Sequence, residues 1–158
     1  MTQLLHLGET VASRLSYAAP TTVQAAVAVL AGMSGAAKVL AGGTDLLVQL
    51  RSGRSRPDLI VDIKRIPGLI GVREADGGFV IGAATPCAVI GEHRALMEAW
   101  PGVVEAARLI GSTQVQGRAS LAGNLCNASP AADSVPAMIA RVAGSSIWRT
   151  IWPASPGR

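Results

Sequence analysis

The chain is organised around a stretch of eight residues, Val39-Leu40-Ala41-Gly42-Gly43-Thr44-Asp45-Leu46. The apolar run over 36–41 predicts a buried strand, which the two glycines end. Gly42 and Gly43 can adopt positive φ and let a ligand approach the backbone, so we expect both to be closed to larger side chains. Thr44 or Asp45 can cap a following helix. A strand, a glycine turn and a helix start direct several N–H groups at one point, which suits a pyrophosphate. An ordinary strand-to-helix turn is the alternative.

A second stretch combines small residues, a glycine and two amides: Ser120-Leu121-Ala122-Gly123-Asn124-Leu125-Cys126-Asn127-Ala128-Ser129-Pro130-Ala131-Ala132-Asp133. Gly123 and Asn124 predict a turn, where Asn tolerates the left-handed conformation. Pro130 predicts the start of a helix, because proline at the first helical position needs no N–H donor. Asp133 then lies in the first turn, where the helix dipole favours a carboxylate. A plain turn residue and a plain first-turn carboxylate are the alternatives for Asn124 and Asp133.

The two motifs together resemble the FAD-binding medium subunit of the molybdenum hydroxylases, which include xanthine dehydrogenase, carbon monoxide dehydrogenase and aldehyde oxidoreductases. The resemblance covers about residues 15–139 and rests on AGGTDL followed by SLAGN and ASPAAD. It implies an α+β domain with FAD extended between two lobes. The first lobe, a small parallel sheet with helices, spans about 15–62; the second, mostly antiparallel, spans about 63–141. Residues 1–14 are then an N-terminal extension.

The tail over residues 142–158 matches nothing in the family pattern. The family continues at this point with further strands of the flavin domain. We therefore expect an incomplete second lobe, through a truncation or a frameshift near Arg141.

The resemblance also implies which residues bind FAD. The first stretch matches a pyrophosphate-binding loop, and Ser120 to Asn124 match a second phosphate-binding loop in which Ala122 replaces the first of two glycines. Asp133 matches a carboxylate on the ribose side of the cofactor. Ile110 falls where xanthine-oxidising members have an aromatic residue near the flavin. The predicted cofactor-binding residues are Val39, Leu40, Ala41, Gly42, Gly43, Thr44, Asp45, Leu46, Ile110, Ser120, Leu121, Ala122, Gly123, Asn124 and Asp133.

Periodicity and turn residues predict the remaining elements. A helix capped by Thr22 is expected first, with one face made of Val23, Ala26, Val27 and Leu30. A buried strand follows at 58–63, and a hairpin of strands at 69–72 and 79–81 turns at Asp76-Gly77-Gly78.

The C-terminal part is predicted to be mostly helical. One helix is expected at 85–93 and another at 103–110, which ends at Gly111 and has one face made of Val103, Ala106, Ala107 and Ile110. A connector at 114–116 and a strand at 119–121 complete the predicted elements.

Composition excludes several classes of function. The chain has 158 residues and is 49% hydrophobic, enough for one domain with a core. The net charge is +4, but aromatic residues make up only 3%, so stacking on nucleic-acid bases is poorly supported. Cys87 and Cys126 form no C-x-x-C pair, so we predict no metal site and reduced thiols in the cytoplasm. No apolar run predicts a membrane span, and no secretory signal is apparent.

The function that the resemblance implies is electron transfer. A partner subunit carrying molybdopterin oxidises the substrate, a small subunit carrying [2Fe–2S] clusters passes electrons on, and FAD in this chain delivers them to an acceptor. No residue here is predicted to act as an acid–base catalyst. A non-functional or scaffolding fragment and a stand-alone flavin oxidase are the alternatives.

Overall fold

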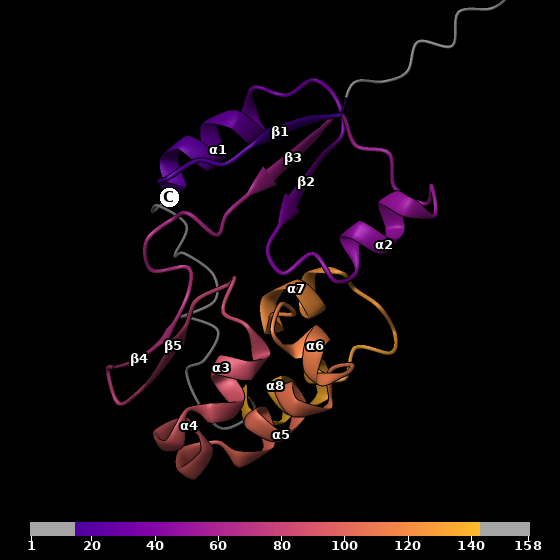
Figure 1. The fold of residues 1–158 in the computed structure, drawn as a ribbon. Helices are drawn as coiled ribbons and strands as arrows, with labels where there is room; N and C mark the ends of the chain where they lie inside the picture. The colour runs from indigo at the N-terminus through magenta and orange to yellow at the C-terminus, as the bar shows by residue number, and fades with distance from the viewer. Residues whose placement is uncertain (1–14, 143–158) are drawn as a thin grey trace, which may run out of the picture.

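The computed structural model describes residues 15–142. Its elements are, in chain order, β1 (Ser16–Ala18), α1 (Val23–Ala31), β2 (Ala37–Leu40), α2 (Leu46–Arg51), β3 (Leu59–Asp62), β4 (Val72–Ala75), β5 (Gly78–Ile81), α3 (Cys87–Glu92), α4 (Arg94–Ala99), α5 (Pro101–Leu109), α6 (Thr113–Gln116), α7 (Leu121–Cys126) and α8 (Ser134–Val142). This is an α+β fold, as predicted (Figure 1). The predicted extension over 1–14 and the tail beyond Val142 lie outside the described residues.

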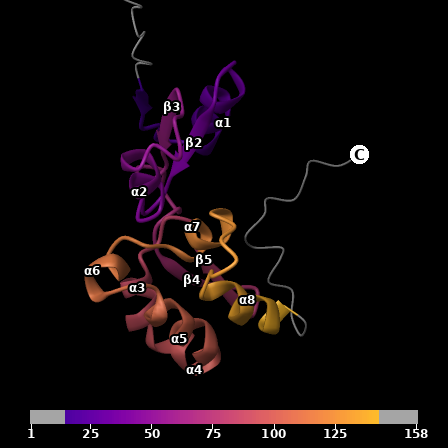
Figure 2. The ribbon, with the colours of Figure 1, turned by 90° about the vertical axis from the view of Figure 1, so that its right-hand side faces the viewer.

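Three short parallel strands form the sheet of the N-terminal lobe, in the order β1-β3-β2. The central strand β3 is buried at all four positions, as its apolar sequence predicts. In contrast, β2 lies at an edge. The prediction of a buried strand at 36–41 is therefore wrong about burial: Lys38 and Val39 are exposed, because β2 has a strand on one side only. The helices α1 and α2 lie on opposite sides of the strands in both ribbon views (Figures 1 and 2).

Helix α1 begins where the sequence predicts. The Thr22 hydroxyl oxygen accepts a 3.1 Å hydrogen bond from a backbone N–H of the first turn. The predicted inner face is only half right. Ala26 is buried and Leu30 packs against the cluster around β3, whereas Val23 and Val27 are exposed. The sheet is narrow, so it covers only the stripe of the helix that contains Ala26 and Leu30.

The C-terminal lobe combines the hairpin β4–β5 with helices α3 to α8 (Figure 1). Asp76 and Gly77 form the two-residue turn of the hairpin, both with positive φ, which matches the twist of the flanking strands. The first strand lies at 72–75 and not at 69–72, because the register pairs Val72 with Ile81 across that short turn.

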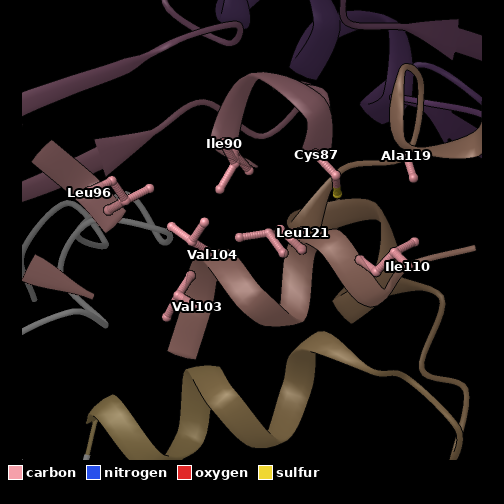
Figure 3. Packing of buried hydrophobic residues seen from close by; sticks show 9 residues of the cluster. Cys87, Ile90, Leu96, Val103, Val104, Ile110, Ala119 and Leu121 are labelled. Atoms are coloured by element: carbon pink, nitrogen blue, oxygen red, sulfur yellow. The ribbon is translucent and has the colours of Figure 1, made fainter. Parts of the chain in front are cut away.

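The core of this lobe lies between α3, α4, α5 and α7. Figure 3 shows its buried side chains, which are Cys87, Ile90, Leu96, Val103, Val104, Ala107, Ile110, Ala119 and Leu121. The face predicted for α5 is confirmed, since all four of its residues are buried. The helix ends before Gly111, whose φ is +59°.

The chain from residue 112 onward is more helical than predicted. Residues 113–116, expected as a connector, form α6. The strand expected at 119–121 is absent, because the Ser120 side chain caps α7 and places Gly123 and Asn124 inside that helix. The helix expected to open at Pro130 begins instead at Ser134; before it, the Ser129 hydroxyl and carbonyl oxygens accept hydrogen bonds in a local turn.

Candidate functional site

The glycine turn that follows β2 is closed to larger side chains, as expected, but for two different reasons. Gly43 has a φ of +82°, in the region that favours glycine. Gly42 does not have a positive φ. A Cβ placed there would overlap the carbonyl oxygen of Arg118 and lie 2.7 Å from its carbonyl carbon. Gly42 therefore lets the first motif pack directly on the backbone that leads into the second.

None of the backbone hydrogen bonds within residues 15–142 uses the N–H of Gly42, Gly43 or Thr44 as a donor. Asp45 stands at the N-cap position of α2, but its side chain makes no capping hydrogen bond. The turn thus presents several free N–H groups next to one another, which is the chemistry that an anionic ligand needs.

The second motif is held by its own side chains. The Ser120 hydroxyl oxygen accepts a 3.1 Å hydrogen bond from the N–H of Gly123. The Asn124 side-chain oxygen accepts a 2.6 Å hydrogen bond from the Ser134 hydroxyl, and Ser134 is fully buried. Asn124 is therefore not a left-handed turn residue. It joins α7 to the start of α8, and the left-handed residue of the segment is Ala128, with a φ of +53°.

The two motifs line one cavity of about 390 Å³ between the lobes. In both ribbon views α7 lies next to the end of the lobe that carries β2 and α2 (Figures 1 and 2). The lining residues are Lys38, Val39, Ala41, Gly42, Gly43, Thr44, Asp45, Leu46, Gln49, Ile63, Ala83, Ile110, Ala119, Ser120, Ala122, Gly123, Asn124, Cys126 and Asn127.

Most of the predicted site residues are therefore brought together, including Ile110. Three are not among the lining residues. Leu40 is the last residue of β2, and Leu121 is buried in the core of the C-terminal lobe. Asp133 is exposed and lies outside the cavity, between α7 and α8.

Sequence reasoning missed several lining residues, chiefly Lys38, Gln49, Cys126 and Asn127. Lys38 is one residue before Val39 and, like it, exposed on an edge strand, so it could have been found had β2 been predicted as an edge. Cys126 and Asn127 lie within the quoted second stretch. No local signal distinguishes Gln49 from other polar helix residues.

A network of Tyr17, Asp62 and Lys64 contacts the first motif at Ala41. Asp62, buried at the end of β3, accepts a 2.6 Å hydrogen bond from the Tyr17 hydroxyl and forms a 2.8 Å ion pair with Lys64. The Lys64 ammonium also donates a 3.2 Å hydrogen bond to the carbonyl oxygen of Ala41, directly before the glycine turn.

Two opposing effects set the pKa of Asp62. Burial by itself raises this pKa, but the hydrogen bonds from Lys64 and Tyr17 outweigh it and hold the pKa below its ordinary value. The hydrogen bond to Asp62 raises the pKa of Tyr17. At neutral pH the network is therefore ionised at Asp62 and holds Lys64 against the loop.

The two cysteines differ sharply. Burial raises the pKa of the Cys87 thiol to about 11, and its side chain belongs to the core. Cys126 is exposed and lines the cavity. Within residues 15–142, no group of three His, Cys, Asp or Glu side chains could hold a metal ion.

Comparison with known proteins identifies the domain. The family described as the FAD binding domain in molybdopterin dehydrogenase matches residues 12–147. The chain belongs to this family. FAD is accordingly its cofactor, and the two motifs that line the cavity both lie within the matched residues.

Similar members of this FAD-binding family are subunits of larger enzymes. The carbon monoxide dehydrogenase medium chain of Hydrogenophaga pseudoflava is 37% identical over 120 residues, which cover 76% of this chain and 42% of that one. The xanthine dehydrogenase FAD-binding subunit of Escherichia coli O157:H7 is 39% identical over 99 residues, which cover 62% and 34%. The chain thus spans about two fifths of the length of the curated relatives it matches.

A solved structure shares the fold. It is carbon monoxide dehydrogenase from Hydrogenophaga pseudoflava lacking the Mo-pyranopterin moiety of the molybdenum cofactor, with a TM-score of 0.71 and 37% identity; the match covers 74% of this chain and 41% of that one.

None of the helices in the described part of this chain has the length and apolar character needed to cross a bilayer.

Proposed function

We propose that this protein is the FAD-binding electron-transfer subunit of a molybdenum hydroxylase and that FAD binds in the cavity between the two motifs. One observation carries the proposal. Two segments far apart in the sequence line the same cavity, with Gly42 packed on the backbone that leads into the second.

The residues present fit the diphosphate of FAD. The N–H groups of Gly42, Gly43 and Thr44 are free to donate, and all three residues line the cavity. Lys38 brings a positive charge to the cavity wall, while Asp45 brings a negative one. A diphosphate bound to backbone N–H groups is stabilised without depending on any single side chain.

The remaining residues of the site have supporting roles. FAD supplies the redox chemistry when bound, and the protein orients it and adjusts its surroundings. Ile110 contributes an apolar contact, in keeping with the predicted position near the flavin. Asp133 is proposed on the ribose side by resemblance only, since the exposed carboxylate stands away from the cavity wall.

Partner subunits complete the proposed enzyme. We infer that electrons arrive from a small subunit with [2Fe–2S] clusters, which receives them from a molybdopterin subunit that oxidises the substrate in the cytoplasm. The similar proteins support this, because their names describe a medium chain, an FAD-binding subunit and a subunit of a dehydrogenase complex.

The test is co-purification from the native host. A tagged chain should bring with it a protein that contains [2Fe–2S] clusters and one that contains molybdopterin, and the bound flavin should be reduced when the complex receives its substrate. A lone chain that holds flavin and turns over a substrate by itself would contradict the proposed role and support the flavin-oxidase alternative.

A further inference from the structure

Two contacts connect the first motif and its following helix with the second motif. One is the packing of Gly42 on the backbone of Arg118. The other is a hydrogen bond from the Gln49 side-chain nitrogen to the Asn127 side-chain oxygen, at 2.8 Å. This hydrogen bond joins α2 to the residue that follows α7. Both amides line the cavity.

Each amide is rigidly connected to one of the two motifs. Gln49 lies on α2, and the N–H groups of Leu47 and Gln49 donate to the carbonyl oxygens of Gly43 and Asp45, at 3.0 and 2.9 Å. A displacement of Gln49 therefore displaces the first glycine turn. Its side chain reaches Asn127 in the other lobe.

Asn127 has the same relation to the second motif. It ends α7, and its N–H donates a 2.9 Å hydrogen bond to the carbonyl oxygen of Gly123. The left-handed Ala128 then turns the chain away from the helix. The amide pair thus connects the helix that follows the first motif with the helix that contains the second.

We propose that Gln49 and Asn127 are positioning residues that hold the two motifs together around FAD and so set the rate at which FAD dissociates. The inference rests on the proposed function. The pair is neutral and half-buried, so it joins two walls of the cavity without adding a charge that would compete for the diphosphate. Because water can satisfy both amides when they separate, the contact can also open for the cofactor to leave.

Four chains test the inference: the wild type, Gln49→Met, Asn127→Ala and the double variant. Each full chain is loaded with FAD and diluted, and the recovery of FAD fluorescence gives the dissociation rate. Loss of one hydrogen bond should speed dissociation by about fivefold in either single variant. Since both changes break the same contact, the double variant should dissociate at about the same rate as the singles.

Exchanging the two amide residues tests whether their hydrogen bond can be restored. Gln49→Asn shortens one of the two amide side chains and should therefore speed FAD dissociation. Adding Asn127→Gln lengthens the other side chain by the same amount, so the double variant should dissociate within about twofold of the wild-type rate. Gln24→Asn on the exposed surface of α1 is the matched control and should leave the rate unchanged. The urea midpoint of each variant is measured in parallel, because a merely structural contact would lower the midpoint and leave the dissociation rate as it was.

The outcomes are distinct. Single effects that multiply in the double variant, or a swap that restores nothing, would mean that each amide acts separately and would overturn the inference while leaving the FAD site intact. A wild-type chain that retains no FAD would overturn the proposed function together with this inference.

Discussion

The substitution Gly42→Ala tests the meeting of the two motifs with a single methyl group. The new Cβ would overlap the carbonyl oxygen of Arg118 and lie 3.1 Å from the Cα of Ala119. Both are backbone atoms, so no side-chain rotation can relieve the contact, and the two motifs must separate. Overpacking of this kind costs about 1–3 kcal/mol. If that cost is borne by the FAD-binding form, affinity falls by roughly 5- to 150-fold.

Titration of the protein with FAD, followed by flavin fluorescence, measures this loss, and urea unfolding of the FAD-free protein shows how much of the cost falls on folding. Gly102→Ala is the matched control, because a Cβ at Gly102 in α5 would meet nothing within 4 Å. The control should bind FAD as the wild type does. If Gly42→Ala instead binds FAD within about twofold of the wild type, the close packing at Gly42 does not matter for FAD binding.

Three further predictions concern the surroundings of the site. Asp62→Asn should lower the free energy of unfolding by about 1 kcal/mol at pH 7. The folded pKa of Asp62 lies below its ordinary 3.8, so its contribution is present above pH 3.8 and is lost as the pH falls through the folded pKa. Urea unfolding of both proteins from pH 7 downward should therefore show the difference between them shrink once the pH falls below 3.8. Iodoacetamide should label Cys126 in the folded protein and Cys87 only after unfolding, as mass spectrometry can show, and saturating FAD should slow the labelling of Cys126. Ala128→Gly should raise the free energy of unfolding by about 1 kcal/mol, because φ is +53° there, and an unchanged urea midpoint would speak against that strain.

Much of the site could be predicted from the sequence because its two motifs depend on local chemistry. A glycine pair directly after an apolar strand has few structural uses, and the positive φ of Gly43 is one of them. The close packing at Gly42 could not be predicted in the same way. It depends on Arg118, which is distant in the sequence and reaches Gly42 only through the fold of both lobes.

The errors in the second motif have a physical origin. Gly123 and Asn124 favour turns in isolation, yet the Ser120 cap and the hydrogen bond from Ser134 to Asn124 place both in a helix. Tertiary contacts outweigh local preference in this segment. Burial was misjudged for a similar reason: the sequence of β2 is apolar, but only the topology shows that this strand lies at the edge of its sheet and leaves Val39 exposed.

The most direct test of the FAD site is the visible spectrum of the purified chain after saturation with FAD and gel filtration. Retained flavin should give bands near about 370 and 450 nm. We expect these bands for the wild-type chain and a marked loss of them for Gly42→Ala. A correctly folded wild-type chain that emerges without flavin would contradict the assignment of the cavity to FAD.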